Sequence, residues 1–406
     1  MPVMENSRPR IMNIMIVNSL YAPNATGGAE RSVKILAETL VNYGHQVTVV
    51  CLGKEPSNDV VNGVHVYYLK LSNAHWPFGE KHNLVKRAIW HTLDIHNEIM
   101  GRAVGEIILR EKPDVIHTNN VTGFSVAVWS EATKLNVPIV HTIRDYYLLC
   151  VKSSMYSTNN NCKHQCLLCR IVTQRMRAAT RHVKHVVGIS RHMIQQHQSF
   201  NVFTETPYSV IYNSNMSVQG AGQEIKEGPL RLGYIGRLES AKGLDLLIDT
   251  YISSPVISGV DLLIAGDGDH AYIKKINSKI FGTRARIVGE VDSCEFLSKI
   301  DVLVVPSLWN EPFGRVIIEA YSHGVPVIAS KRGGIMENVI EGRTGYIFDP
   351  DDPSTLRSLL EKFVEQPKLV RRMAQDCLDK SRDFLPEHAA EEYIEIYARM
   401  MKRGVE

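Results

Sequence analysis

The sequence predicts an α/β protein made of two Rossmann-like, doubly wound domains that face each other across a cleft. Short apolar runs alternate with amphipathic helical stretches, which is typical of parallel sheets covered on both faces. This alternation stops in the Gly-, Ser- and Asn-containing stretch 206–229 and then restarts. The length of 406 residues also exceeds that of one typical domain.

Composition and charge exclude several classes of protein. The net charge is only +3, from 46 Lys and Arg against 43 Asp and Glu, so nucleic acid is not an expected partner. No apolar run approaches the ~20 residues of a membrane span, and the start resembles no secretory leader. Seven Cys is an odd number, which favours reduced thiols over a disulfide framework. We therefore expect a cytoplasmic protein.

In the first half, apolar stretches are expected to form one parallel sheet. The helix expected over residues 27–44 carries Val33, Leu36, Ala37 and Leu40 on one face, so it covers that sheet. The predicted strands read IMNIMIVNSLY, QVTVVCLG, PDVIHTNN and VPIVHTIRD.

The second half repeats this pattern with its own strands and helices. The predicted strands read LRLGYIGRL, VDLLIAGDGD, RARIVGEV, IDVLVVPS, VPVIAS and TGYIFDP. The expected domains are therefore residues 1–207 and 208–385, followed by a helix over 386–406. In two such domains, the ligand is expected at the carboxyl ends of the strands, in the cleft.

Two glutamates, Glu311 and Glu319, flank a Pro-Phe-Gly turn in the stretch EPFGRVIIE. If most of the interval is helical, they stand about 12 Å apart along the axis. Carboxylates that cleave a glycosidic bond together stand roughly 5 to 9.5 Å apart. The two glutamates are therefore expected to bind two parts of one extended ligand. The alternative is that Glu319 is a solvated helix residue.

EPFGRVIIE resembles the E-x7-E motif of retaining GT-B glycosyltransferases, especially the large family four. The resemblance covers about residues 14 to 400 and implies the GT-B fold, with residues 1–207 on the acceptor side, residues 208–385 binding the nucleotide sugar, and the helix over 386–406 crossing back to the first domain. It implies that Glu311 orients the donor sugar, that Glu319 binds the ribose, and that the donor pocket includes Arg315 and the backbone near Phe313 and Gly314.

Two cations follow the first strand of the second half, in RLESAKG. Arg237 and Lys242 lie on a strand-to-helix turn, where cations suit a diphosphate. The resemblance implies that they stabilise the leaving diphosphate, so Glu311, Arg237 and Lys242 are the expected catalytic residues. Taken alone, an Arg and a Lys in a surface loop are usually only solvated.

The acceptor side is expected to involve a glycine loop and a departure from the family pattern. Gly27 and Gly28 precede a helix and let backbone N–H groups approach a substrate, although a tight turn is the simpler interpretation. Arg144, followed by Asp145, stands where many family members have a His. Arg cannot act as a general base. Binding an anionic acceptor or the diphosphate is the expected role of Arg144.

Four of the seven Cys cluster as C-x11-C-x3-C-x2-C: Cys150, Cys162, Cys166 and Cys169. This spacing suits a structural Zn site, and the surrounding polar loop has few apolar anchors. The alternatives are reduced thiols and, because C-x3-C-x2-C is the radical-SAM spacing, an iron–sulfur cluster. No cofactor is expected for the transfer itself.

The stretch 170–187 places Arg and Lys between apolar residues, which is a solvated helix face or a surface for an anionic membrane. A basic helix is more often a solvated face, but the resemblance adds support for membrane contact, because family members often use lipid-linked acceptors. The location expected is thus the cytoplasm, including the inner face of the membrane.

The sequence predicts a retaining hexosyltransferase that uses a nucleotide diphosphate sugar and a glycan or lipid-linked acceptor. No D-x-D motif lies at a strand end, so transfer without a metal is expected. One alternative is a nucleotide-sugar epimerase or a dinucleotide oxidoreductase, although no G-x-G-x-x-G follows the first strand. The other is a non-catalytic partner subunit of the same fold.

Overall fold

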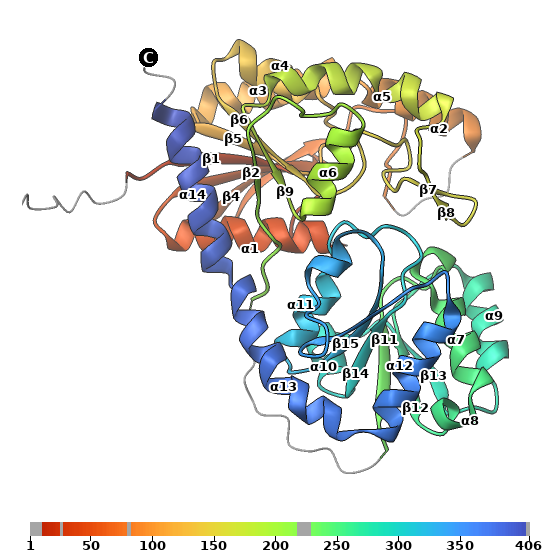
Figure 1. The fold of residues 1–406 in the computed structure, drawn as a ribbon. Helices are drawn as coiled ribbons and strands as arrows, with labels where there is room; N and C mark the ends of the chain where they lie inside the picture. Colours follow the sequence, from red (N-terminus) through yellow and green to blue (C-terminus); the bar gives the residue numbers. More distant parts are fainter. Residues whose placement is uncertain (1–9, 25–26, 79–82, 217–228, 403–406) are drawn as a thin grey trace, which may run out of the picture.

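Two open sheets form two lobes, one above the other in Figure 1, with helices against both faces of each sheet. The coordinates are a computed structural model that describes residues 10–24, 27–78, 83–216 and 229–402. The predicted α/β architecture of two Rossmann-like domains is confirmed.

The first sheet has eight strands in the order β10-β9-β6-β5-β1-β2-β4-β3, and every pair except β3–β4 is parallel. Its strands are β1 (Asn13–Val17), β2 (Gln46–Gly53), β3 (Ser57–Val61), β4 (Val64–Lys70), β5 (Val115–Thr118), β6 (Ile139–Ile143), β9 (His185–Gly188) and β10 (Tyr208–Val210). Its helices are α1 (Gly28–Asn42), α2 (Leu84–Asp94), α3 (Glu98–Glu111), α4 (Ala127–Lys134), α5 (Leu167–Ala179), η1 (Thr180–His182) and α6 (Arg191–Ser199).

The second sheet has six parallel strands in the order β13-β12-β11-β14-β15-β16. Its strands are β11 (Arg231–Ile235), β12 (Asp261–Ala265), β13 (Ala285–Gly289), β14 (Val302–Val305), β15 (Val327–Ser330) and β16 (Gly345–Phe348). Its helices are η2 (Ser240–Lys242), α7 (Leu244–Ser253), α8 (Pro255–Ser258), α9 (His270–Ile280), α10 (Ser293–Leu297), α11 (Arg315–Tyr321), η3 (Gly333–Glu337), α12 (Pro353–Glu365), α13 (Lys368–Ser381) and η4 (Arg382–Phe384).

Alternation of side chains along β1 builds the core on both faces of the first sheet. Ile14 and Ile16 pack in one cluster with residues of α1 and of the last helix, α14 (Pro386–Lys402). Met15 and Val17 pack on the other face with residues of α3 and α4. A strand buried on both faces reads as a continuous apolar run, which is why β1 is apolar from Ile14 to Val17.

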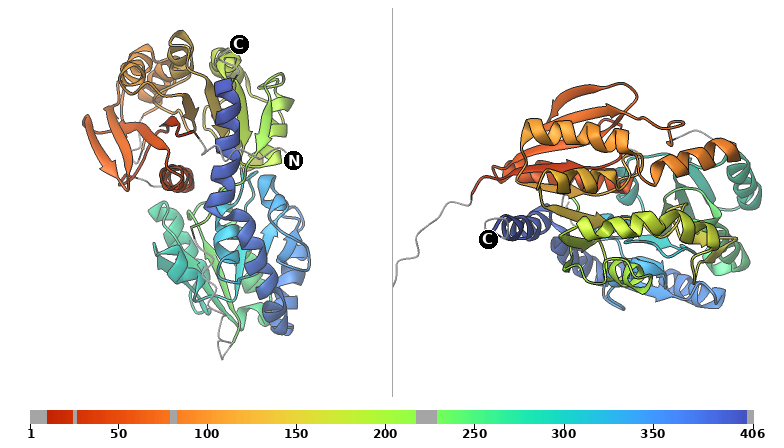
Figure 2. Two further views of the ribbon diagram at one scale, coloured as in Figure 1. Left: turned by 90° about the vertical axis from the view of Figure 1, so that its left-hand side faces the viewer. Right: turned by 90° about the horizontal axis from the view of Figure 1, so that it is seen from above.

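Helix α14 leaves the second lobe and runs along the first, as the left view of Figure 2 shows. Tyr393 and Tyr397 are buried against the first sheet. The Tyr393 hydroxyl lies 2.9 Å from Thr142 Oγ1, and the Tyr397 hydroxyl lies 2.7 Å from His117 Nδ1. These buried hydrogen bonds fix the helix against β5 and β6.

The connection between the lobes begins later than the expected boundary after residue 207. β10 starts at Tyr208 and pairs with β9, so the first sheet extends to Val210. The sequence does not reveal this edge strand, because it is only three residues long and lies among polar and glycine residues. Strand β11 opens the second sheet at Arg231.

Candidate active site

A cavity of about 590 Å³ lies between the lobes, at the carboxyl ends of β11 and β14 and the amino end of α1. It brings together seven of the residues expected to bind substrate, which come from both lobes. They are Gly27, Gly28, Lys242, Glu311, Gly314, Arg315 and Glu319.

The carboxylate of Glu311 lies in the loop between β14 and α11, where the residue is almost fully buried at 8% exposure. Its Oε1 accepts hydrogen bonds from Lys242 Nζ at 2.6 Å and from Ser307 Oγ at 2.7 Å. Burial raises the pKa of Glu311, but the Lys242 ammonium and its hydrogen bonds outweigh burial, so the pKa lies below its usual value. Glu311 is therefore a fixed carboxylate at neutral pH.

Glycines shape the backbone around Glu311. Gly333 has φ +58°, and a Cβ there would come within 2.2 Å of the Glu311 carbonyl oxygen. The Gly334 amide donates to that same oxygen at 2.7 Å. Gly314, at φ +85°, precedes the first residue of α11. Glycine adopts these positive φ values without strain, and it has no Cβ to clash with the Glu311 backbone. This explains Gly314 in the Pro-Phe-Gly turn and the glycines of the loop SKRGG.

Glu319 lies inside α11 and is held by two arginines from different elements. Its Oε1 accepts from Arg315 Nε at 2.9 Å and from Arg31 Nη1, across the cleft, at 3.1 Å. Both arginines contact Oε1. The other oxygen, Oε2, has no hydrogen bond with any described residue. Because α11 begins only at Arg315, the helical rise assumed for the whole Glu311–Glu319 interval does not apply.

Lys242 and Arg237 lie in different surroundings. Lys242 Nζ lies 5.0 Å from the ring centroid of Trp309 as well as against Glu311, so its charge is directed into the cavity. Arg237 is largely exposed and forms an ion pair with Glu239 at 3.3 Å. It lines a neighbouring hollow beside Gly236, and not the cavity itself.

The glycine loop of the first lobe faces the second lobe. Gly28 is the first residue of α1, and a Cβ added to it would lie 3.3 Å from Arg315 Cδ. Arg315 Nη1 in turn donates to Ser32 Oγ at 2.8 Å and to the Ser214 carbonyl oxygen at 3.0 Å. A larger residue at Gly28 would therefore press on the arginine that holds Glu319.

Besides Arg237, three residues expected to bind substrate lie outside the lining of the cavity, namely Phe313, Arg144 and Asp145. The Phe313 side chain is buried against Tyr212 and Phe384, because the Pro-Phe-Gly turn directs it into the core. The expectation for the donor pocket concerns the backbone near Phe313, so it stays a prediction.

Arg144 and Asp145 line a small hollow within the first lobe. Arg144 is buried, and its guanidinium donates to Asn119 Oδ1 at 2.8 Å and to Asn213 Oδ1 at 2.7 Å. Asp145 accepts from the Tyr147 amide at 2.8 Å. Neither side chain is directed into the cavity, and their expected contact with a substrate stays a prediction.

The four clustered cysteines gather around the start of α5. Cys166 precedes that helix and its Sγ accepts from the Cys169 amide at 3.4 Å, which lowers the pKa of Cys166. Burial raises the pKa of Cys162 and Cys169, and nearby Cys150 adds to the effect. Within the described residues, no three His, Cys, Asp or Glu side chains are arranged to hold a metal ion. The Zn site stays a prediction that this geometry does not support.

Sequence reasoning missed Arg31 and Lys34 of α1 and Asp292 and Ser293 at the start of α10, which all line the cavity. Arg31 follows Gly27 by four residues, about one helical turn, on the polar face of α1. That position could have placed it beside the glycine loop. Asp292 is a helix-capping residue in the motif DSCE, which gives no signal of a ligand.

Solved structures with the same arrangement are glycosyltransferases of the GT-B type. Anabaena HepE in complex with UDP matches with a TM-score of 0.71 and 18% identity, over 96% of this chain and 100% of that one. Sucrose-phosphate synthase from Thermosynechococcus elongatus matches with a TM-score of 0.75 and 19% identity, over 96% and 99%. The two lobes and the cleft thus define a GT-B fold.

Sequence comparison assigns the family. Residues 26–214 match the family described as Glycosyltransferase Family 4, and residues 219–377 match Glycosyl transferases group 1. A 42.6 kDa protein in the cps region of Klebsiella pneumoniae is 34% identical over 80% of this chain and 87% of its own length. Glycogen synthase of Mycobacterium tuberculosis is 27% identical over 90% and 89%. The chain belongs to the group 1 glycosyltransferases of family four.

Across the described part of the chain, no helix is both long and apolar enough to cross a membrane.

Proposed function

We propose that the protein transfers a hexose from a nucleotide diphosphate sugar to a hydroxyl of a glycan or lipid-linked acceptor, with retention at the anomeric carbon. The observation that carries this proposal is the Lys242–Glu311 pair at 2.6 Å in a cavity that also contains Glu319. An anchored carboxylate suits sugar hydroxyls, and a neighbouring ammonium suits a phosphate.

In the proposed reaction, the bond between the anomeric carbon and the donor phosphate oxygen breaks, and the diphosphate leaves with the electron pair. Lys242 stabilises the charge that develops on this leaving group, since a preorganised cation in a buried site acts most strongly on developing charge. Arg237 approaches the same group from the neighbouring hollow.

The acceptor hydroxyl then forms the new bond on the face from which the diphosphate departs. Its proton passes to the leaving phosphate oxygen, so the reaction needs no protein base. This route fits a chain that has Arg144 at the position where many relatives carry His, because a guanidinium does not give up its proton.

The nucleotide is proposed to lie with its ribose at Glu319. Oε1 of Glu319 is held by Arg31 and Arg315, and Oε2 is left for the ribose hydroxyls. UDP is the first nucleotide to test, since the fold is similar to that of HepE, which was solved with UDP.

The first experiment incubates the protein with UDP-, GDP- and ADP-hexoses in EDTA and measures release of the nucleoside diphosphate. Slow hydrolysis of one donor without acceptor, with the α-anomer of the sugar as first product, supports a retaining, metal-independent transferase. Binding of a nucleoside diphosphate without any turnover of its sugar would indicate a non-catalytic partner subunit. Interconversion of the donor sugar without release of the nucleotide would indicate an epimerase.

Helix α5 is proposed to contact an anionic membrane surface during use of a lipid-linked acceptor. Leu167, Leu168 and Ile171 are 74%, 62% and 61% exposed, and Arg170 and Arg175 are exposed on the same helix. Apolar residues beside cations suit the boundary of anionic lipid.

Flotation with phosphatidylglycerol vesicles tests this contact, with phosphatidylcholine vesicles as the neutral control. Binding to the anionic vesicles that is lost in Leu168→Glu supports the contact. Equal behaviour of wild type and variant would contradict it.

A further inference from the structure

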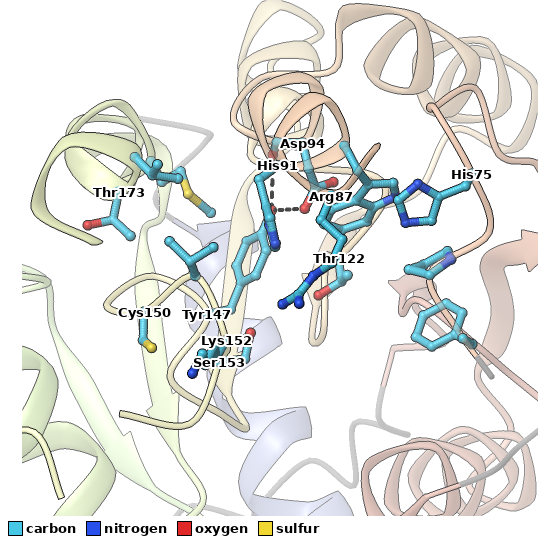
Figure 3. A pocket seen from close by; sticks show the side chains of 16 residues that line it. His75, Arg87, His91, Asp94, Thr122, Tyr147, Cys150, Lys152, Ser153 and Thr173 are labelled. Atoms are coloured by element: carbon cyan, nitrogen blue, oxygen red, sulfur yellow. Dashed lines mark hydrogen bonds between the residues drawn. The ribbon is translucent and has the colours of Figure 1, made fainter. Parts of the chain in front are cut away.

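A second cavity, of about 460 Å³, lies inside the first lobe between α2, residues 75–78, residues 150–153 and α5 (Figure 3). None of its lining residues lines the cavity between the lobes. Arg87 points into its middle in Figure 3, and Lys152 lies on the opposite side, below it.

Two cations line the cavity. Arg87 and Lys152 form no ion pair with any described residue, and both are exposed. Among the described lining residues the single acidic one is Asp94, which is buried, and burial raises its pKa to about 8. Asp94 is therefore mostly neutral at pH 7, so the described lining residues carry a net positive charge.

Aromatic side chains form another part of the lining. Phe78, Trp90, His75 and Tyr147 all line the cavity, and the rings of His75 and Trp90 are 6.1 Å apart. Trp90 is 5% exposed, and its Nε1 is a buried donor without a hydrogen-bond partner among the described residues. A buried donor without a partner is costly, so a ligand oxygen that accepts from it would be favoured.

Two consecutive tyrosines connect this cavity by hydrogen bonds to the loop that carries Glu311. Tyr147 donates to Asp94 Oδ2 at 2.8 Å in the cavity. The preceding residue, Tyr146, donates to the Asn310 carbonyl oxygen at 2.8 Å, next to Glu311. The same loop contacts the second lobe again at a short hairpin of β7 (Tyr156–Ser157) and β8 (Asn160–Asn161), where Asn161 Oδ1 accepts from the Asn310 amide at 2.7 Å.

From these observations we infer that the second cavity binds an anionic sugar unit of the acceptor, with its carboxylate or phosphate between Arg87 and Lys152 and its ring against Trp90. This inference rests on the proposed transferase function. Aromatic rings offer apolar faces to a sugar ring, and the two cations select an acidic substituent. The backbone from Tyr146 to Tyr147 joins this unit to the donor centre.

The test measures binding of three small probes by saturation-transfer NMR and by quenching of tryptophan fluorescence. The probes are glucuronate, glucose 6-phosphate and glucose. We expect at least one of the two acids to bind roughly ten-fold or more tightly than glucose, since a charge-assisted hydrogen bond contributes most of the difference. The better acid identifies a carboxylate or a phosphate as the natural substituent.

Variants test whether the probes bind in this cavity. Arg87→Ala combined with Lys152→Ala is expected to weaken the acid roughly ten- to hundred-fold, and Trp90→Phe is expected to remove the fluorescence change. The matched control is Arg102→Ala on α3, whose side chain is 72% exposed and pairs with Glu98.

Two results would overturn the inference: equal binding of glucose and both acids, or unchanged binding of the acid in the Arg87 and Lys152 double variant. If inorganic phosphate binds as tightly as glucose 6-phosphate, the cavity does not recognise the sugar ring, and that part of the inference is wrong. Binding of nucleoside diphosphates and hydrolysis of the donor are measured in parallel, so a failure of the transferase proposal is seen separately.

Discussion

Arg31 of the first lobe and Glu319 of the second form an ion pair of 3.1 Å across the cleft. Arg315 shares the same carboxylate oxygen and also donates to Ser32 of α1, so three charged side chains and a hydroxyl join the lobes at the candidate ribose site. A nucleotide that reaches Glu319 would therefore contact a group to which both lobes contribute. Binding at this site and closure of the cleft are expected to be coupled.

Glu319→Gln is expected to weaken binding of the nucleoside diphosphate roughly ten- to hundred-fold, because hydrogen bonds from ribose hydroxyls to a charged acceptor contribute about 1.5 to 3 kcal/mol. Titration calorimetry measures the change. Gln keeps the shape of the side chain, whereas Ala would also leave Arg315 without its partner. The control is Glu295→Gln, whose carboxylate is 63% exposed on α10. An unchanged Kd would exclude the ribose role.

Lys242→Ala is expected to lower kcat more than it raises KM for the donor. Charge on the diphosphate grows as the sugar bond breaks, so an ammonium placed there acts mainly in the transition state. A loss of about 10²- to 10³-fold in kcat is expected by comparison with other preorganised donors. Steady-state kinetics with varied donor check this, with Lys299→Ala as the exposed control. Normal kcat with a raised KM would mean that Lys242 binds ground state and transition state equally.

The protein is expected to lose stability as pH rises toward 8 because of Asp94. Burial raises the pKa of this residue from 3.8 to about 8, while hydrogen bonds from Tyr147 and the Gly123 amide oppose the rise. Its contribution to the free energy of unfolding is thus fully present below pH 3.8 and declines as pH rises to about 8. Each pKa unit of that window corresponds to about 1.4 kcal/mol, as an upper estimate for a buried group.

Asp94→Asn removes this titration and keeps the side-chain shape. Urea unfolding at several pH values between 4 and 8 should show that the variant gains stability relative to wild type as pH rises. A difference between the two proteins that does not change with pH would contradict the assignment.

The zinc prediction is tested by elemental analysis of protein prepared without chelator. About one Zn per chain, lost in Cys166→Ser, is the result that the cysteine spacing predicts. Losing that metal should impair use of the acceptor and spare nucleotide binding, since the loop belongs to the first lobe. Metal-free protein with reactive thiols would support the reduced-thiol interpretation, with Cys166 expected to react first because its pKa is lowered.

The fold was predictable, and so was the position of Glu311 between a strand and the next helix. Apolar strands and the turns after them depend on residues that are close together in the sequence. The contacts of Lys242 and Glu319 with their partners depend on how β11, β14 and α1 meet, and no local pattern encodes that. Arg31 is an ordinary helix residue in sequence and becomes part of the site only because the lobes face each other. The burial of the Phe313 side chain against Tyr212 and Phe384 likewise depends on contacts between distant segments.

Helix α14 has a consequence for how the chain folds during synthesis. It is translated after the whole second lobe, yet Ala390, Tyr393 and Tyr397 complete the apolar cluster formed by α1, β1 and β2. Until α14 leaves the ribosome, one face of the first sheet stays partly uncovered, although all its own strands have been made. The first lobe therefore reaches its final packing only after the second lobe has been synthesised, and exposed apolar surface on the nascent chain would attract chaperones during that interval.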